Sequence, residues 1–220
     1  MGPQQIASLV QQTGFIPLFT HTDIGICRNV LKASYDAGVR IFEFTNRNAN
    51  SFDIFIELRK YCSEQLPGMV LGIGTIKNAQ QANQFIHAGA DFLISPLILE
   101  EIQQVAAAHK KLWIPGCATA SEIGLAEYWG LDTVKIFPAR QLGGPGFIKA
   151  VKAVFPNMRF VATGGVEPTD EDISNWFKGG VAAVGIGSQL FPAEWLANGE
   201  LALVTNHIKK IIQYIEKGKV

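Results

Sequence analysis

Cysteine and histidine are scarce in this chain of 220 residues, and their spacing excludes two kinds of site. The three cysteines, Cys27, Cys62 and Cys117, form no CxxC pair and are odd in number. We therefore expect reduced thiols, as is typical of the cytosol, rather than a framework of disulfides. The four histidines show no HxH or HxxxH spacing, so the sequence predicts no dedicated metal site.

The sequence also lacks an excess of charge of either sign and any long apolar run. Lysine plus arginine and aspartate plus glutamate both number 19, so the net charge is zero and no nucleic-acid surface is expected. No apolar run reaches about 18 residues, and the N-terminal segment lacks the basic start and apolar core of a signal peptide. These absences predict a cytoplasmic protein that binds neither nucleic acid nor membrane.

What the chain does contain is a regular alternation of short apolar runs and longer amphipathic segments. Eight runs read as β-strands, at residues 15–19, 39–45, 69–74, 91–95, 112–116, 133–137, 159–163 and 182–187. Helices are expected near residues 22–37, 50–65, 78–88, 98–109, 119–129, 144–154, 169–179 and 199–217. Residues 3–13 read as an additional helix ahead of the first strand, and residues 188–197 as a short turn.

This order of elements predicts a barrel. Strand–helix units repeated eight times in about 200 residues are typical of a (β/α)8 TIM barrel of the α/β class. No run of Pro, Gly and Ser is long enough to separate domains, so we expect residues 1–220 to form one barrel domain with an extra N-terminal helix. A doubly wound open sheet is the alternative, but such sheets usually have about five or six strands.

A lysine interrupts the apolar strand that is expected to precede Pro138. Side chains of a barrel strand alternate between the interior and the helices, and Val134 and Ile136 suit the helix side. Lys135 and Phe137 then point inward, near the end of the barrel where enzymes keep their active sites. The amine either snorkels outward or pairs with a carboxylate, or it serves as a Schiff-base nucleophile. A nucleophile needs a pKa about three units below the usual value near 10.4, which an apolar pocket and a nearby arginine provide.

The second expected strand places a carboxylate on the same inner surface. Phe42 and Phe44 share the face that suits the helices, whereas Glu43 lies on the other face. Arg47 follows four residues after this glutamate. Glu43 alone is equally well explained as the partner of an internal base. The presence of Glu43 together with Lys135, both at the same end of the barrel, favours catalysis.

Glycine-rich segments follow the last two expected strands. They are ATGGVEP at residues 162–168 and GIGS at residues 185–188. Barrels often bind phosphate with these two loops and the N-terminus of a short helix, and Thr163 and Ser188 add hydroxyl donors. The glycines otherwise form only tight turns. Their paired location after the seventh and eighth expected strands favours a phosphate site.

Ordered motifs along the chain, seven in all, resemble one known family. They are FEFTNR (42–47), GIGT (72–75), ISP (94–96), IPGCAT (114–119), VKIFPA (134–139), TGGV (163–166) and GIGS (185–188). Their order and spacing resemble those of the class I 2-keto-3-deoxy-6-phosphogluconate (KDPG) and 4-hydroxy-2-oxoglutarate (KHG) aldolases. The resemblance extends over about residues 10–195.

The resemblance implies a role for each matching residue. Lys135 matches the Schiff-base lysine, and Glu43 matches the general acid and base, which acts through a water. The residues implied for the pyruvate carboxylate and its pocket are Arg47, Thr75, Pro96 and Phe137. Those implied for the phosphate are Thr163, Gly164, Gly165, Gly187 and Ser188.

The activity implied by the resemblance is cleavage of KDPG to pyruvate and glyceraldehyde 3-phosphate, with KHG cleavage to pyruvate and glyoxylate beside it. Members of the family are typically homotrimeric and cytoplasmic, and they use no metal or cofactor beyond the lysine imine. The alternatives are an aldolase specific for the galactonate epimer, a non-catalytic barrel that binds a phosphate ligand, and a phosphosugar epimerase. The joint presence of Lys135, Glu43 and Arg47 favours the aldolase.

Three positions depart from the pattern of the family. Thr20 stands at the end of the first strand, where many members carry arginine, and Arg47 supplies the arginine that other members carry at the second strand. Leu97 follows ISP, where smaller or polar residues are common. Arg140 stands where many relatives carry glutamate, so we expect it either to add a cation near the pocket mouth or to face solvent.

Overall fold

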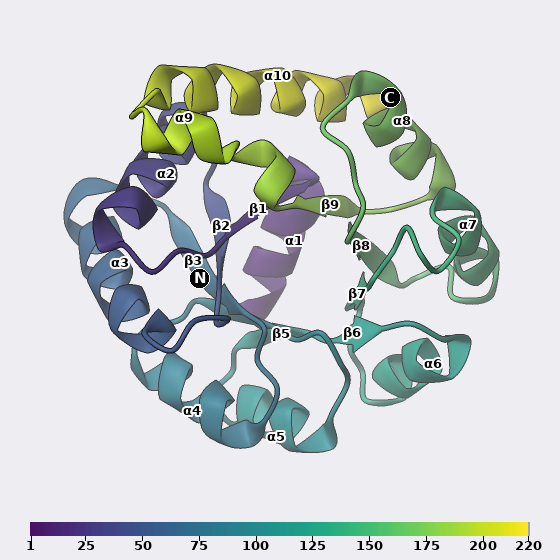
Figure 1. The fold of residues 1–220 in the computed structure, drawn as a ribbon. Coiled ribbons are helices and arrows are strands. Elements are labelled where there is room, and N and C mark those ends of the chain that lie inside the picture. The colour runs from purple at the N-terminus through teal and green to yellow at the C-terminus, as the bar shows by residue number, and fades with distance from the viewer. Residues whose placement is uncertain (220) are drawn as a thin grey trace.

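The computed structural model describes residues 1–219, which form an α/β fold around a nearly closed parallel barrel (Figure 1). The strands are β1 (Phe15–Phe19), β2 (Ile41–Thr45), β3 (Val70–Gly74), β4 (Phe92–Ile94), β5 (Leu112–Ile114), β6 (Gly116–Cys117), β7 (Thr133–Ile136), β8 (Arg159–Thr163) and β9 (Ala183–Ile186). The helices are α1 (Pro3–Thr13), α2 (Ile24–Asp36), α3 (Ser51–Gln65), α4 (Ala79–His87), α5 (Glu100–Ala108), α6 (Ala120–Tyr128), α7 (Pro145–Val154), α8 (Asp170–Gly179), α9 (Ala193–Ala197) and α10 (Leu201–Gly218).

The prediction of eight strands was wrong by one, because the expected strand at residues 112–116 is divided into β5 and β6 by Pro115. Proline has no N–H to donate to the ladder, so regular pairing stops there. The sheet runs in the order β5-β4-β3-β2-β1-β9-β8-β7-β6, and every pair is parallel. Lys135 N–H donates to the Pro115 carbonyl oxygen at 2.8 Å, so hydrogen bonding continues past the break and the barrel nearly closes.

Helix α1 closes the end of the barrel at which the strands begin. Its Ile6, Ala7 and Val10 are buried and join an inner apolar cluster. The strands contribute side chains mostly from their first residues, namely Ile16, Ile41, Val70, Phe92, Ile94, Leu112, Ile114, Val161 and Ala183. Figure 1 shows α1 inside the ring formed by the other helices. The barrel interior is therefore packed at this end, whereas the cavity beside Lys135 lies toward the carboxyl ends of the strands.

A second, larger cluster fills the layer between the strands and the surrounding helices. Phe42 and Phe44 of β2 and Val134 and Ile136 of β7 all belong to this outer cluster. Their placement confirms the predicted alternation, since side chains of one parity face the helices. The intervening side chains of β2 and β7 face the barrel interior, which places Glu43 and Lys135 there.

The segment after β9 begins with the short helix expected after GIGS and contains a second helix where a short turn was predicted. Residues 188–197 form a 3₁₀ turn (Ser188–Leu190) followed by α9. Leu190 and Phe191 are buried beneath this segment, so their apolar side chains fold it onto the barrel mouth. The last helix, α10, packs against α8 and α2 and completes the outer ring. No helix within residues 1–219 is both long and apolar enough to cross a bilayer.

Candidate active site

Lys135 and Glu43 face each other inside the barrel. The Nζ of Lys135 on β7 lies 3.9 Å from Oε1 of Glu43 on β2, and the two side chains are only 5% and 2% exposed. This separation is longer than a hydrogen bond. Glu43 Oε1 is buried without a hydrogen-bond partner among residues 1–219. A buried polar atom left unpaired in this way is unusual, and it leaves Glu43 free to bond to an incoming molecule.

Burial shifts the pKa values of these two groups in opposite directions. It lowers the pKa of the Lys135 amine, and Arg47 lowers it further, while Glu43 opposes both effects. Burial also raises the pKa of the Glu43 carboxyl, against the attraction of Lys135 and Arg47. Removal from water penalises the charged form of each group, so both are moved toward neutrality. A neutral amine is the form that attacks a carbonyl carbon.

Arg47 and Thr75 form a polar pair on the cavity wall. Arg47 Nε donates a hydrogen bond to Thr75 Oγ1 at 3.4 Å. Thr75 follows β3 with a φ of 62°, a backbone conformation that β-branched residues rarely adopt. Such strain is typical of functional sites, where the surrounding structure holds a side chain in place. The guanidinium and hydroxyl groups together suit an anionic carboxylate.

The predicted site residues surround one cavity of about 520 Å³ at the barrel mouth. Ten of them line it, namely Arg47, Thr75, Pro96, Lys135, Phe137, Thr163, Gly164, Gly165, Gly187 and Ser188. Glu43 is not among the lining residues, but it lies 3.9 Å from Lys135, which lines the cavity. The ring of Phe137 also lies close to this amine, with its centre 5.1 Å from Nζ. Residues that are distant in the sequence therefore meet in one place.

Sequence reasoning missed four of the residues that line the cavity. They are Leu18, Val166, Gly185 and Gln189. Leu18 was detectable, since it shares the inner parity of β1 with the buried Ile16. Val166 and Gly185 lie within the glycine-rich motifs but carry no polar side chain. Gln189 follows Ser188 in the 3₁₀ turn, whose course the sequence did not specify.

Backbone donors collect on the side of the cavity formed after β8 and β9. The N–H groups of Gly164, Gly165 and Ser188 donate no hydrogen bond to any partner within residues 1–219. The two glycines have φ values of 94° and 81°, which side chains rarely permit. Free N–H groups on glycine loops form a concave surface that is well suited to an anion. A cavity with an amine of lowered pKa, a nearby carboxyl group and such a surface can hold a phosphorylated keto acid.

Comparison with known proteins identifies the family of this chain. A family model described as KDPG and KHG aldolase matches residues 6–207. The chain belongs to this aldolase family. It is 33% identical over 182 residues to the KHG/KDPG aldolase of Escherichia coli K12, covering 83% of each chain. The resemblance identified from the ordered motifs is thereby confirmed, and the chain is a lyase of the aldolase class.

Two solved structures of the family have the same fold. The KDPG aldolase of Legionella pneumophila, captured with pyruvate as a covalent carbinolamine, superposes with a TM-score of 0.82 at 27% identity. It covers 90% of this chain and 93% of its own. The KDPG aldolase of Zymomonas mobilis ZM4 with 3-phosphoglycerate superposes with a TM-score of 0.83 at 28% identity, covering 96% and 97%.

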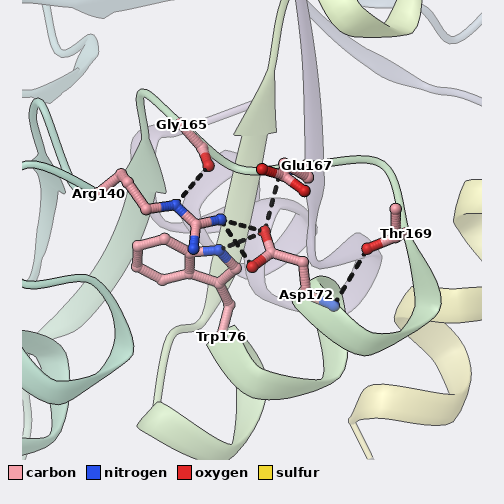
Figure 2. A network of polar contacts seen from close by, with 6 residues as sticks. All are labelled: Arg140, Gly165, Glu167, Thr169, Asp172 and Trp176. Atoms are coloured by element: carbon pink, nitrogen blue, oxygen red, sulfur yellow. Dashed lines mark hydrogen bonds and ion pairs between the residues drawn. The ribbon is translucent and has the colours of Figure 1, made fainter.

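The departures from the aldolase pattern are explained by local contacts. Arg140 lies beside the cavity as a cation and is partly exposed to solvent, so each expectation holds in part. Neither expectation included its ion pair with Asp172 (Figure 2). Thr20 accepts a hydrogen bond from Asn48 Nδ2 at 3.0 Å. Leu97 packs on the outer cluster.

Side chains that commonly bind metals do not gather within the described residues of this aldolase chain. Among residues 1–219, no three His, Cys, Asp or Glu side chains lie close enough together to hold a metal ion. The acidic and sulfur-bearing side chains near the barrel mouth are separated in space, and Cys117 is buried within β6. The polar groups of the cavity are an amine, a guanidinium, hydroxyls and backbone N–H groups, which suit anions.

Proposed function

We propose that this chain cleaves KDPG to pyruvate and glyceraldehyde 3-phosphate through a Schiff base on Lys135. The observation that carries the proposal is the buried amine of Lys135, held 3.9 Å from Glu43 beside a cavity of about 520 Å³. Burying an amine inside a barrel costs free energy, so its presence there suggests a function. Burial and Arg47 lower the pKa of this amine, which favours the nucleophilic form.

The first half of the reaction forms the imine. The neutral Lys135 amine attacks the C2 carbonyl carbon of the substrate and gives a carbinolamine. Loss of the C2 hydroxyl as water leaves a protonated imine, whose positive nitrogen accepts electrons from C3. Glu43, with its raised pKa, holds the proton that the departing hydroxyl needs.

The second half breaks the bond between C3 and C4. Glu43, now a carboxylate, takes the proton of the C4 hydroxyl through a water, and the C4 oxygen forms a carbonyl. The electron pair of the C3–C4 bond moves toward the imine nitrogen, which leaves a neutral enamine. The aldehyde departs, Glu43 returns its proton to C3, and hydrolysis of the imine releases pyruvate and the Lys135 amine.

We propose that the carboxylate and the phosphate at the two ends of the substrate bind at two different anion sites. Arg47 and Thr75 hold the carboxylate next to C2, which is supported by their mutual contact of 3.4 Å on the cavity wall. Thr163, Gly164, Gly165, Gly187 and Ser188 hold the phosphate. Support comes from the unpaired N–H groups of this segment and from the 3-phosphoglycerate in the Zymomonas relative. Pro96 and Phe137 complete the wall.

Cleavage of KHG to pyruvate and glyoxylate is a second proposed reaction. It is supported by the name of the Escherichia coli relative, KHG/KDPG aldolase. We also propose, on the family resemblance, that residues 1–220 act as one barrel domain in a cytoplasmic homotrimer without metal or cofactor. Loss of activity in a chelator such as EDTA would contradict the metal-independent mechanism.

Reduction with borohydride in the presence of pyruvate tests the proposal. We expect a stable adduct on Lys135, detected by intact mass and located by peptide mapping, and no adduct on Lys135→Met. Release of pyruvate from KDPG in a coupled assay is expected alongside. A folded wild-type protein that forms no adduct contradicts the Schiff-base mechanism, and it would favour the non-catalytic phosphate-binding alternative.

A further inference from the structure

Arg140 and Asp172 bind the backbone of two residues in the short loop between β8 and α8. Arg140 Nε donates a hydrogen bond to the Gly165 carbonyl oxygen at 2.8 Å, and its Nη2 lies 2.7 Å from both oxygens of Asp172 (Figure 2). Asp172 also accepts a hydrogen bond from the Glu167 N–H at 2.8 Å. Because Asp172 belongs to the first turn of α8, the loop is tied to that helix at two points.

The carboxylate at the centre of this network is well shielded. The Asp172 side chain is 13% exposed, and its Oδ2 accepts a further hydrogen bond from Trp176 Nε1 at 3.0 Å. Trp176 is fully buried, and the centre of its ring lies 5.5 Å from the Arg140 guanidinium carbon. Charge-assisted bonds in such surroundings are short and strong, so the network holds a defined geometry.

Arg140 also contacts the two glycines of the loop directly. Its backbone N–H donates to the Gly164 carbonyl oxygen at 3.0 Å. A Cβ on Gly165 would collide with the Arg140 side chain, so the arginine packs closely on this glycine. Glycines with positive φ have many accessible conformations and lose more freedom on ordering than other residues. The contacts with Arg140 restrict both of them.

These contacts bear on the cavity, because Gly164 and Gly165 line it whereas Arg140 does not. The N–H groups of both glycines donate no hydrogen bond within residues 1–219 and remain available to an anion. The Arg140 charge is offset by Asp172, and its Nε already binds the Gly165 carbonyl oxygen. The guanidinium is therefore placed to orient the loop and not to contact the anion.

We propose that Arg140 and Asp172 are positioning residues that hold the backbone of Gly164 and Gly165 ready for the phosphate of the substrate. They thereby set a preference for phosphorylated over unphosphorylated keto acids. This inference rests on the proposed function, since it deepens the account of how that site selects its substrate. Its test must therefore separate phosphate binding from imine formation.

Kinetics of Arg140→Met and Asp172→Asn with KDPG and KHG measure the effect. We expect the KM for KDPG to rise about 10- to 100-fold in each variant, because a charge-assisted contact is lost. The kcat for KDPG and both constants for KHG, which lacks a phosphate, stay within about threefold of wild type. The KM of Arg140→Lys for KDPG is expected to lie between the values of wild type and Arg140→Met. A lysine can pair with Asp172, but it lacks the planar guanidinium that also binds Gly165.

A matched control is available at the opposite end of β8. Arg159 Nη1 pairs with Asp132 Oδ2 at 3.1 Å, and this pair is remote from the cavity lining. Arg159→Met is expected to leave the KM of both substrates unchanged. A rise of both KM values by the same factor in Arg140→Met would show a merely structural role and overturn the proposal.

The direction in which Asp172→Asn changes the KM for KDPG distinguishes a positioning role of Arg140 from direct contact between Arg140 and the phosphate. If the guanidinium itself binds the phosphate, loss of the Asp172 charge releases it and lowers the KM for KDPG. A lower KM in Asp172→Asn together with a higher KM in Arg140→Met would therefore overturn the proposal. Thermal unfolding of each variant verifies the fold, and Arg140→Lys replaces Arg140→Met if the methionine variant does not fold.

Binding of inorganic phosphate, measured by calorimetry, does not depend on catalysis. We expect its Kd to rise about tenfold or more in Arg140→Met and to stay unchanged in Arg159→Met. Borohydride trapping of pyruvate is expected to be intact in all variants. If wild type traps no pyruvate, the proposed function fails, while weaker phosphate binding in Arg140→Met still supports the positioning role. An unchanged Kd in both Arg140→Met and Asp172→Asn overturns it.

Discussion

Gly74 on β3 lies directly beside Glu43 on β2, and the Glu43 carboxylate fills the space that a side chain at residue 74 would occupy. The register of the two strands pairs Glu43 with Gly72 and Thr45 with Gly74, so the carboxylate extends along β3 toward its end. The absence of a side chain at this position is what allows a buried carboxylate to point at Lys135.

Gly74→Ala is therefore expected to displace the carboxylate and to lower kcat by about 10²- to 10⁴-fold, the usual worth of a general acid and base. Pyruvate trapping on Lys135 should still reach completion over a long incubation, since the amine is untouched, although imine formation becomes slower. Steady-state kinetics and borohydride trapping measure the two effects. Gly146→Ala is the control, because a Cβ there meets nothing within 4 Å. Equal kcat values for the two variants would show that Glu43 tolerates the added methyl group.

Glu43→Gln removes the proton acceptor while keeping the shape of the side chain. We expect kcat for KDPG to fall by about 10²- to 10⁴-fold. The adduct between pyruvate and Lys135 should still form over a long incubation, but more slowly, because Glu43 also supplies a proton for imine formation. The coupled pyruvate assay and intact mass after reduction report the two steps separately. Turnover at the wild-type rate would show that another group moves the proton.

The lowered pKa of Lys135 predicts a dependence of stability on pH. Between this lowered value and the usual value of about 10.4, the unfolded chain binds a proton that the folded chain lacks. Stability then rises with pH through this window, by at most about 1.4 kcal/mol per pH unit, and falls as pH decreases.

Urea unfolding of Glu43→Gln and of the double variant Glu43→Gln/Lys135→Met isolates this effect, because the opposite titration of Glu43 is absent from both. The free energy of unfolding of Glu43→Gln should rise relative to the double variant between about pH 7 and pH 9. All other titrating groups cancel in the difference. A difference that stays constant with pH would mean that the Lys135 amine has an ordinary pKa in the folded protein.

The three thiols are expected to be unreactive in the folded protein. Burial raises the pKa of Cys27 and Cys117 to about 12 and that of Cys62 to about 11. Because the thiolate is the reactive form, Ellman's reagent at about pH 8 should label none of them rapidly. In guanidinium chloride all three should react. Rapid labelling of one thiol per chain before denaturation would identify a residue that opens to solvent.

The inward placement of Lys135 and Glu43 was predictable because it depends on local structure alone. Side chains of a strand alternate, and the apolar neighbours Val134, Ile136 and Phe42 mark the face that packs on helices. The same reasoning gave the glycine loops after the last two strands, since barrels repeat one geometry around the axis. The break at Pro115 was also visible in the sequence, but its effect on the strand count was not anticipated.

The ion pair between Arg140 and Asp172 was not predictable, because the two residues are 32 positions apart in the sequence. No local pattern indicates that Asp172 turns its carboxylate toward β7 rather than toward solvent. The need for glycine at residue 74, where the Glu43 carboxylate occupies the space of a side chain, was not predictable either. In the sequence Gly74 looks like any other strand residue. Both relationships depend on which elements become neighbours once the barrel closes.

The packing of α1 into the base of the barrel has a consequence for the order of events in catalysis. The buried side chains of Ile6 and Val10 fill the barrel where the strands begin, whereas the cavity beside Lys135 lies at the carboxyl ends of the strands. The glycine segments after β8 and β9 line this cavity together with Lys135. In the proposed reaction pyruvate stays attached to Lys135 until the imine is hydrolysed. We therefore expect the aldehyde to leave through this end of the barrel first and pyruvate to be the last product to depart.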